Sequence, residues 1–347
     1  MLKKLFFCNS YHTLIIAIYS LETEPSEIDV VLSSCIPEVE KIENRLKSLD
    51  LFNNVFYFDD DELRSKTTME LHNKSKLQGF MYFLFRKNWK YIESKLKICK
   101  TINFNNYDQL IVFNANLPVV LVLMGLKKRI VVHEDGKNQL RKIYMKNNHE
   151  VLYKMLSPFE NKNILWGLPF GMTKYVDYFV TTNPVERDNM LFRKPIKVVK
   201  DYEETVLSKK TLEKLRKLFE IDEKILSKKK KMLVLTVSLY KAGIVNSESD
   251  QVEVYRQIIN RFNSEGMDVF IKPHPLDTVD YNGIKDCIHI NKNFPIELVC
   301  YEKGVEIELA VTIRSSSILG INAKSKYFYD IDNFKNGKFD VYGGNFI

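Results

Sequence analysis

Short apolar runs alternate with longer segments of helical periodicity along most of the chain, and this alternation restricts the fold more than any other feature. Strand-length runs separated by amphipathic helices predict parallel β-sheets joined by helical crossovers. We expect helices at 12–21, 38–49, 118–126 and 252–262. We expect strands at 4–8, 28–32, 54–58, 109–113, 129–133, 178–182, 232–237, 267–271, 288–290 and 310–313.

The alternation stops between residues 185 and 231, in a charged segment that has few strand patterns and ends in the lysines 228–231. After this segment the same alternation begins again. A chain of 347 residues is long enough for two domains with separate cores. We therefore predict an α/β fold with two Rossmann-like parallel-sheet domains, residues 1–200 and 201–347.

The net charge is +8, from 52 basic and 44 acidic residues. This charge fits either a solvated basic surface or a surface for an anionic partner such as a nucleotide, an acidic membrane face or nucleic acid. The basic residues are spread along the chain, and no helix-turn-helix, zinc-finger or RNA-binding signature is found. We therefore expect no nucleic-acid partner, although a basic nucleic-acid-binding protein stays as the non-enzyme alternative.

The cysteines and the apolar stretches indicate the cellular compartment of the protein and whether it has a membrane anchor. The five cysteines form no CxxC pair, which favours a reducing cytoplasm over a disulfide framework or a zinc site. The apolar run at 1–8 is interrupted at 9–12, and the longest apolar stretch, 117–126, is about half of a membrane-spanning helix. We expect a cytoplasmic protein without a membrane anchor. Peripheral contact with the inner face of the plasma membrane stays open, because the aromatic and lysine residues of 79–97 fit either a core helix or a membrane-surface helix.

Polar residues directly after predicted strands are candidate site residues, because ligands of parallel sheets bind beyond the carboxyl ends of the strands. The first such cluster is His133-Glu134-Asp135-Gly136. Adjacent strand residues point to opposite faces, so one of the two acids can enter a crevice and act as a general base. An acidic turn that caps the next helix also explains these residues.

The second cluster lies in the stretch VFIKPHPLD, residues 269–277. Proline disfavours helical geometry in the residue before it, so Pro273 and Pro275 hold Lys272 and His274 in extended conformations. The resulting stiff arm projects His274 beyond the strand. An imidazole in this place can donate a hydrogen bond or a proton to a phosphate, whereas a rigid surface turn is the alternative.

The third cluster is Ser315-Ser316-Ser317, between a predicted strand and an apolar run of helical character. Serines at the start of a helix cap it, and together with free backbone N–H groups they can form an anion site. An ordinary helix cap without a ligand is the alternative.

The three clusters in this order resemble bacterial sialyltransferases, and most closely glycosyltransferase family 52, which contains lipooligosaccharide and capsular polysaccharide sialyltransferases. The matching segments are VVHEDGKNQL, VFIKPHP, FPIELVCYEKGVEIELAVTIRSSSIL and, less clearly, CNSYHTLIIA. The acid-acid-Gly and His-Pro motifs also occur in related sialyltransferase and polysialyltransferase families. The resemblance spans most of the chain in order.

The resemblance implies a GT-B-type fold, in which two Rossmann-like domains face a central cleft, and a donor, CMP-sialic acid, that the second domain holds. It implies an inverting reaction without a metal ion or other cofactor, and transfer to a galactose-terminated capsule or lipooligosaccharide glycan. His274 would serve as general acid, and either Asp135 or Asp250 as general base. The residues implied in substrate binding are Asn9, Ser10, Glu134, Gly136, Lys272, Pro275, Ser315, Ser316 and Ser317.

Several alternatives stay open at this point. A polysialyltransferase, whose acceptor ends in sialic acid, or a CDP-glycerol glycerophosphotransferase of wall polymer synthesis would share parts of the pattern. Asp59 and Asp61, and likewise Asp330 and Asp332, have the spacing that can hold a divalent ion, but solvated acidic turns are the simpler interpretation. The sequence leaves open the linkage formed and the oligomeric state, although related enzymes form homodimers.

Overall fold

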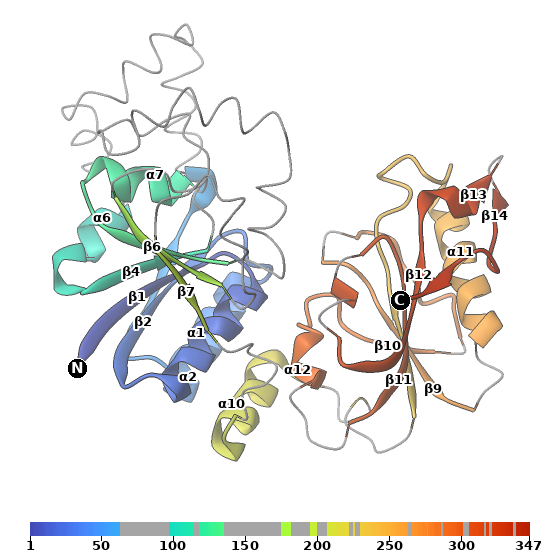
Figure 1. Ribbon diagram of the computed structural model, residues 1–347, viewed down its shortest axis with the longest axis horizontal. Helices are drawn as coiled ribbons and strands as arrows, with labels where there is room; N and C mark the ends of the chain where they lie inside the picture. Colours follow the sequence, from blue (N-terminus) through green and yellow to red (C-terminus); the bar gives the residue numbers. More distant parts are fainter. Residues whose placement is uncertain are drawn as a thin grey trace, which may run out of the picture. The chain divides into compact units, whose positions relative to one another are not determined.

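A computed structural model of the chain (Figure 1) describes residues 1–62, 97–113, 118–134, 175–181, 195–199, 207–221, 225, 230–262, 266–275, 277–285, 287–300, 305–315, 317–318, 321–335 and 338–347. Two compact units divide the chain, Met1–Lys214 and Leu215–Ile347. The boundary predicted from the sequence, at 200/201, lies earlier in the chain, beside residues outside these described ranges.

The first unit contains a seven-stranded parallel sheet of order β3-β2-β1-β4-β5-β6-β7. Its strands are β1 (Leu2–Cys8), β2 (Ser26–Ser33), β3 (Val55–Phe58), β4 (Gln109–Val112), β5 (Ile130–His133), β6 (Val176–Thr181) and β7 (Ile196–Val198). Its helices are α1 (Tyr11–Thr23), α2 (Val39–Leu49), α6 (Lys97–Thr101), α7 (Pro118–Gly125) and the 3₁₀ turn η1 (Phe104–Asn106).

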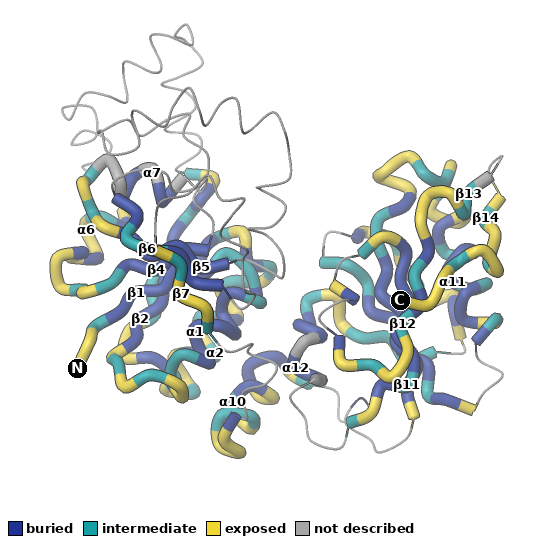
Figure 2. The backbone as a smooth tube through the Cα atoms, in the orientation of Figure 1, coloured by how far each residue is buried: buried dark blue, intermediate teal, exposed yellow. Residues whose placement is uncertain are grey.

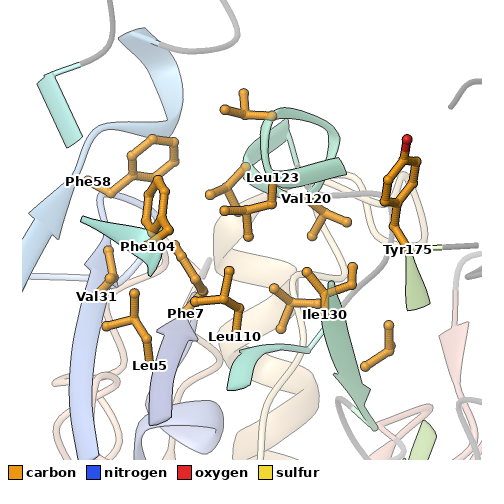
Figure 3. Packing of buried hydrophobic residues seen from close by; sticks show 14 of the residues in the cluster. Leu5, Phe7, Val31, Phe58, Phe104, Leu110, Val120, Leu123, Ile130 and Tyr175 are labelled. Atoms are coloured by element: carbon orange, nitrogen blue, oxygen red, sulfur yellow. The ribbon is translucent and has the colours of Figure 1, made fainter. Parts of the chain in front are cut away.

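Alternate residues of the strands supply apolar side chains to both faces of this sheet, as expected for parallel strands that are covered on both sides. Figure 3 shows one face, where Leu5, Leu110 and Ile130 lie under Val120 and Leu123 of α7. The other face carries the alternate strand residues, and α1 packs there against β1 and β2. Both faces of the sheet are therefore apolar, and the candidate site residues lie at the strand ends.

The second unit contains a six-stranded sheet of order β10-β9-β8-β11-β12-β15, parallel except for β15. Its strands are β8 (Lys231–Leu235), β9 (Asp268–Lys272), β10 (Ile288–His289), β11 (Ile307–Ile313), β12 (Ala323–Tyr329) and β15 (Asn345–Phe346), with a separate hairpin of β13 (Phe334–Lys335) and β14 (Lys338–Phe339). The helical elements are α11 (Glu248–Phe262), α12 (Glu297–Cys300) and η8 (Ile331–Asn333), while α10 (Lys209–Phe219) crosses the division between the units.

Helix α11 covers one face of the second sheet. Its buried residues Tyr255, Ile258 and Ile259 belong to one apolar cluster with strand residues such as Val234 and Ile271. In Figure 2 the central strands of this unit are mostly buried, and exposed residues gather in the connections and at the ends of elements. Because α11 follows β8 in the chain, its first turn lies beside the carboxyl ends of the strands, where Gln251 contacts the turn after β9.

The structure confirms the predicted α/β class with two Rossmann-like parallel sheets, the organisation of GT-B-type enzymes. Every predicted strand is present, with ends that differ by a few residues. Five further strands, β7, β12, β13, β14 and β15, were not predicted, and β12 was missed because its first half carries exposed Lys324 and Ser325. Of the amphipathic segment 79–97, residues 79–96 lie outside the described ranges. None of the described helices is long and apolar enough to span a membrane.

Candidate functional site

The carboxyl edge of the second sheet gathers the polar loops that follow four parallel strands, which the order β10-β9-β8-β11 places next to one another. Ligands of such sheets bind at this edge. Two buried polar atoms there, Ser238 Oγ after β8 and Asn293 Oδ1 after β10, have no hydrogen-bond partner in the described part of the chain. Because buried polar groups are normally paired, this edge offers atoms that a ligand or water can bind.

The predicted arm at His274 is a tight turn, which we call the His274 turn, residues 273–277. The Asp277 N–H donates to the His274 carbonyl at 2.8 Å, and Pro275 occupies the second position of the turn, which proline favours. The His274 N–H donates to Thr236 Oγ1 at 3.2 Å. His274 is therefore half-buried and held through its backbone, rather than projecting as a free arm.

A buried carboxylate, that of Asp277, anchors this turn to the neighbouring elements through hydrogen bonds. It accepts hydrogen bonds from the hydroxyls of Thr236 at 2.9 Å and Tyr281 at 2.7 Å, and from Gln251 Nε2 at 3.0 Å. We call these four residues the Asp277 network. Asp277 is 2% exposed and Gln251 is fully buried, so the network is shielded from water. The network was not predicted from the sequence, although an aspartate stands three residues after His274.

Lys272, which was predicted to bind substrate, is buried at the end of β9. Its ammonium donates to the carbonyls of Pro273 at 3.2 Å and Lys292 at 3.1 Å. These contacts join the His274 turn to the loop after β10. Lys272 therefore has a structural role as well as a positive charge beside His274.

The surroundings of His274 determine its protonation. Burial and the neighbouring Lys272 ammonium lower the pKa of His274 below its ordinary value of 6.5, and Asp277 opposes this effect. In the ligand-free protein the imidazole is therefore mostly neutral at pH 7. An anionic phosphate beside it would favour the charged form and raise its pKa.

Ser315 and Ser317 lie at the same edge, after the end of β11. Ser315 Oγ accepts from the Ser317 N–H at 3.3 Å, while Ser316 lies outside the described residues. Ile318 and Ile321 are buried, and β12 begins at Ala323, which leaves room only for a short turn. At the predicted helix N-terminus, the described residues 317–318 form a 3₁₀ turn, and Ile318 packs into the core. The serine hydroxyls and the turn remain as candidate phosphate ligands.

Asp250, one of the two predicted general bases, lies exposed in the first turn of α11. Its N–H donates to Ser247 Oγ at 3.1 Å, so Ser247 caps the helix. The next residue, Gln251, belongs to the Asp277 network, which places Asp250 at the same sheet edge as His274. An acid in the first turn also interacts favourably with the helix dipole.

At the edge of the first sheet, Asn9 and Ser10 connect β1 directly to α1. Ser10 is the N-cap residue and forms a capping box with Thr13, whose hydroxyl also accepts from the Asn9 N–H at 3.0 Å. Asn9 lines a small hollow together with Cys8, Ser33 and Asp60. Burial raises the pKa of the Cys8 thiol.

The acid cluster begins at the end of β5. Glu134 is buried, donates its N–H to the Val180 carbonyl at 2.9 Å and accepts from the Thr181 hydroxyl. The preceding His133 is buried against the Phe113 ring, with 5.4 Å between the ring centroids, and burial lowers its pKa to about 4. Asp135 and Gly136 lie outside the described residues, so their predicted roles stay predictions.

The acidic pairs noted in the sequence lie at the starts of helical segments, which begin at Asp60 and at Ile331. Asp59 accepts from the N–H groups of Asp61 at 2.9 Å and Glu62 at 3.0 Å, and Asp330 accepts from the Ile331 N–H at 2.7 Å. The residue between Asp59 and Asp61 is the buried one: Asp60 is 2% exposed and accepts from the Ser33 hydroxyl. Within the described ranges, no group of three or more His, Cys, Asp or Glu side chains could hold a metal ion.

Comparison with known families gives a match over most of the chain. The family model of the alpha-2,8-polysialyltransferases matches residues 4–332. This range contains Asn9, the acid cluster, His274 and the serines. No curated protein matches the chain in sequence.

Several solved structures are similar to the chain over most of its length. The UDP-GlcNAc 2-epimerase from Methanocaldococcus jannaschii is 14% identical, with 90% of this chain and 78% of that chain covered and a TM-score of 0.44. The UDP-GlcNAc 2-epimerase from Neisseria meningitidis, bound to UDP-GlcNAc, is 10% identical, with 92% and 79% covered and a TM-score of 0.46. A glycosyltransferase from Streptomyces sp. SF2575 is 9% identical, with 90% and 76% covered and a TM-score of 0.36.

Proposed function

The chain belongs to the alpha-2,8-polysialyltransferase family, and from this premise we propose that it is a metal-independent, inverting sialyltransferase that uses CMP-sialic acid. The family membership supports a glycosyltransferase. The donor, the acceptor and the stereochemistry are our proposal, and so is its closer placement in glycosyltransferase family 52.

The observation that carries the proposal is the carboxyl edge of the second sheet. On either side of β8, the neighbouring strands end there in His274 after β9 and Ser315 after β11. An imidazole N–H and the hydroxyls of Ser315 and Ser238 can donate hydrogen bonds to a phosphate that carries a single negative charge, and Asn293 Oδ1 can accept one from another group of the donor. We assign this edge to the CMP part of the donor. A CMP-sugar has one phosphate, so no metal ion is needed to bridge a diphosphate.

The reaction then forms one bond and breaks one bond. An acceptor hydroxyl oxygen bonds to the anomeric carbon of sialic acid from the face opposite CMP, and the bond between this carbon and the phosphate oxygen breaks. A carboxylate, Asp135 or Asp250, takes the hydroxyl proton. His274 donates a hydrogen bond or a proton to the departing phosphate and stabilises its developing charge. The products are an inverted sialoside and CMP.

We propose two candidate acceptors. The family description favours a glycan that ends in sialic acid, extended through an alpha-2,8 linkage, and the net charge of +8 suits such an anionic polymer. The resemblance to family 52 instead favours a galactose-terminated surface glycan. Homodimer formation and peripheral contact with a membrane stay predictions from the same resemblance.

Incubation with CMP-sialic acid and matched acceptors, ending in sialic acid or in galactose, tests the proposal. Mass and linkage analysis of the products then distinguish the two acceptors. Calorimetry with CMP, UMP and GMP provides the control for the donor. Selective binding of CMP with transfer to either acceptor supports the proposal, and equal affinity for the three nucleotides contradicts it.

A further inference from the structure

We infer that Asp277 is a positioning residue, which sets the orientation of His274 through Thr236 and the His274 turn. This inference rests on the proposed function for the role of His274, but its structural basis is independent of the donor. None of the four residues of the Asp277 network was a site residue predicted from the sequence.

Asp277 connects groups from three different segments of the second unit. Its donors come from the end of β8 (Thr236), the first turn of α11 (Gln251) and the segment after the turn (Tyr281). The Val279 N–H donates to Asp277 Oδ1 at 3.2 Å. A buried carboxylate is costly unless such donors surround it. The network therefore fixes Asp277 in one place with respect to the sheet and α11.

Asp277 is connected to His274 through Thr236 and through the turn itself. The Thr236 hydroxyl donates to Asp277 at 2.9 Å, which directs its lone pairs toward the His274 N–H at 3.2 Å. The Asp277 N–H closes the turn on the His274 carbonyl. Both backbone groups of His274 thus depend on Asp277, one through Thr236 and one directly.

The charge of Asp277 also acts on His274. Among the described residues, the charged groups that shift the pKa of His274 are the Lys272 ammonium on β9 and the Asp277 carboxylate, while the Lys292 ammonium, from the loop after β10, lies 3.5 Å from the Asp277 carbonyl. Asp277 raises the pKa of His274 against burial and Lys272. Burial and the hydrogen bond with Asp277 keep Tyr281 protonated, because they raise the pKa of its hydroxyl. Removal of the Asp277 charge should therefore lower the pKa of His274.

The decisive variant is Asp277→Asn, compared with Asp280→Asn. Asp280 is exposed and accepts only from the Asn282 N–H, at 2.9 Å, among the hydrogen bonds of the described residues. We expect Asp277→Asn to lower kcat roughly 10- to 100-fold, the range for residues that orient a functional side chain. If His274 acts as an acid, activity falls as the pH rises through its pKa, so this descending limb should move to lower pH. Asp280→Asn should leave kcat and the limb unchanged.

A second pair of variants separates positioning from folding. Thr236→Ser keeps the hydroxyl that links Asp277 to His274, whereas Thr236→Val removes it at similar volume. We expect Thr236→Ser to retain turnover within about threefold and Thr236→Val to lose roughly 10-fold or more, with CMP affinity changed less than kcat. If Asp277→Asn does not fold, this pair decides the question.

Histidine ring NMR in the free protein gives a readout that needs no substrate, with the His274 signal assigned from His274→Gln. A lowered His274 pKa in Asp277→Asn, together with the loss of kcat, supports the inference. If Asp277→Asn lowers the melting temperature but leaves the His274 pKa unchanged and kcat within twofold of wild type, the inference is overturned. Equal turnover of Thr236→Ser and Thr236→Val also overturns it. If the wild type neither binds CMP nor transfers sialic acid, the proposed function fails, while the His274 pKa still tests the positioning role.

Discussion

Two of the histidines near the ends of parallel strands, His133 in β5 and His274 just past β9, have contrasting surroundings. His133 is the last residue of its strand, packs against the Phe113 ring and has a pKa lowered to about 4 by burial. His274 lies two residues beyond its strand, half-buried between Lys272 and Asp277. The comparison shows that a place at a strand end is not sufficient to make a histidine a candidate site residue. His133, within the sheet, is a core residue, whereas His274, held past its strand, can meet a ligand.

The largest expected effect is on kcat, and it should distinguish substitution of His274 from substitution of His133. His274→Ala should lower kcat by roughly 10²- to 10⁴-fold, the range for lost acid–base catalysis, with little change in melting temperature. The fold should tolerate it because the His274 contacts with Thr236 and Asp277 use backbone atoms. His133→Phe, the matched control, should retain kcat within about threefold. Unchanged activity of His274→Ala, with a large fall in melting temperature, would make the His274 turn purely structural.

The next prediction concerns the base that works with His274. Asp135→Asn and Asp250→Asn should differ: the general base should lose roughly 10²-fold or more in kcat with normal CMP affinity, and the other should stay near wild type. Single-turnover kinetics and CMP calorimetry measure both quantities. Asp250 is exposed at the start of α11, so its substitution should not destabilise the fold. Full activity of both variants would remove both assignments.

The third prediction uses the buried histidine. His133 is neutral in the folded protein, because its pKa of about 4 lies below the ordinary 6.5. Below pH 6.5 the unfolded chain binds a proton at His133, which the folded protein binds only near pH 4. The contribution of His133 to the free energy of unfolding is therefore fully present above pH 6.5 and is lost as the pH falls toward 4. The free energy of unfolding should decrease by up to about 3 kcal/mol over this window. Denaturation at several pH values should show this slope in the wild type and its loss in His133→Phe, and an equal slope in both would contradict the burial argument.

The smallest expected effect is that of metal removal. Activity should survive EDTA, because the donor has a single phosphate and Asp59 already accepts from two backbone N–H groups of its turn. Loss of activity restored by manganese would contradict the donor assignment. Asp59→Asn and Asp61→Asn would then be the variants to examine.

The alternation of apolar runs was sufficient to predict both sheets, because strands such as β8 and β11 are buried along almost their whole length. It could not predict β12, since Lys324 and Ser325 interrupt its apolar character, nor the antiparallel pairing of β15 at the sheet edge. Local patterns report burial, whereas such pairings depend on residues that are distant in the chain.

The same limit applies to the site. His274 could be proposed as a site residue because two prolines flank it in the sequence itself. Asp277 could not, since its hydrogen bonds come from Thr236, Gln251 and Tyr281, which reach it from three different segments. After the serine cluster, the apolar residues had a helical pattern, whereas the described residues 317–318 form a 3₁₀ turn and β12 begins at Ala323.

The buried thiol of Cys8 can report local unfolding of β1 in the first unit, because it can be alkylated only when the strand opens. Cys8 is fully buried at the end of β1, and its raised pKa keeps it as the unreactive thiol, whereas Cys35 in the same unit is exposed. Alkylation requires the thiolate and access by the reagent. Cys35 should therefore be labelled within the mixing time of a mass-spectrometric experiment, and Cys8 only at the rate at which the central strand transiently detaches. The ratio of these two labelling rates therefore measures how often the sheet unfolds locally beside Asn9.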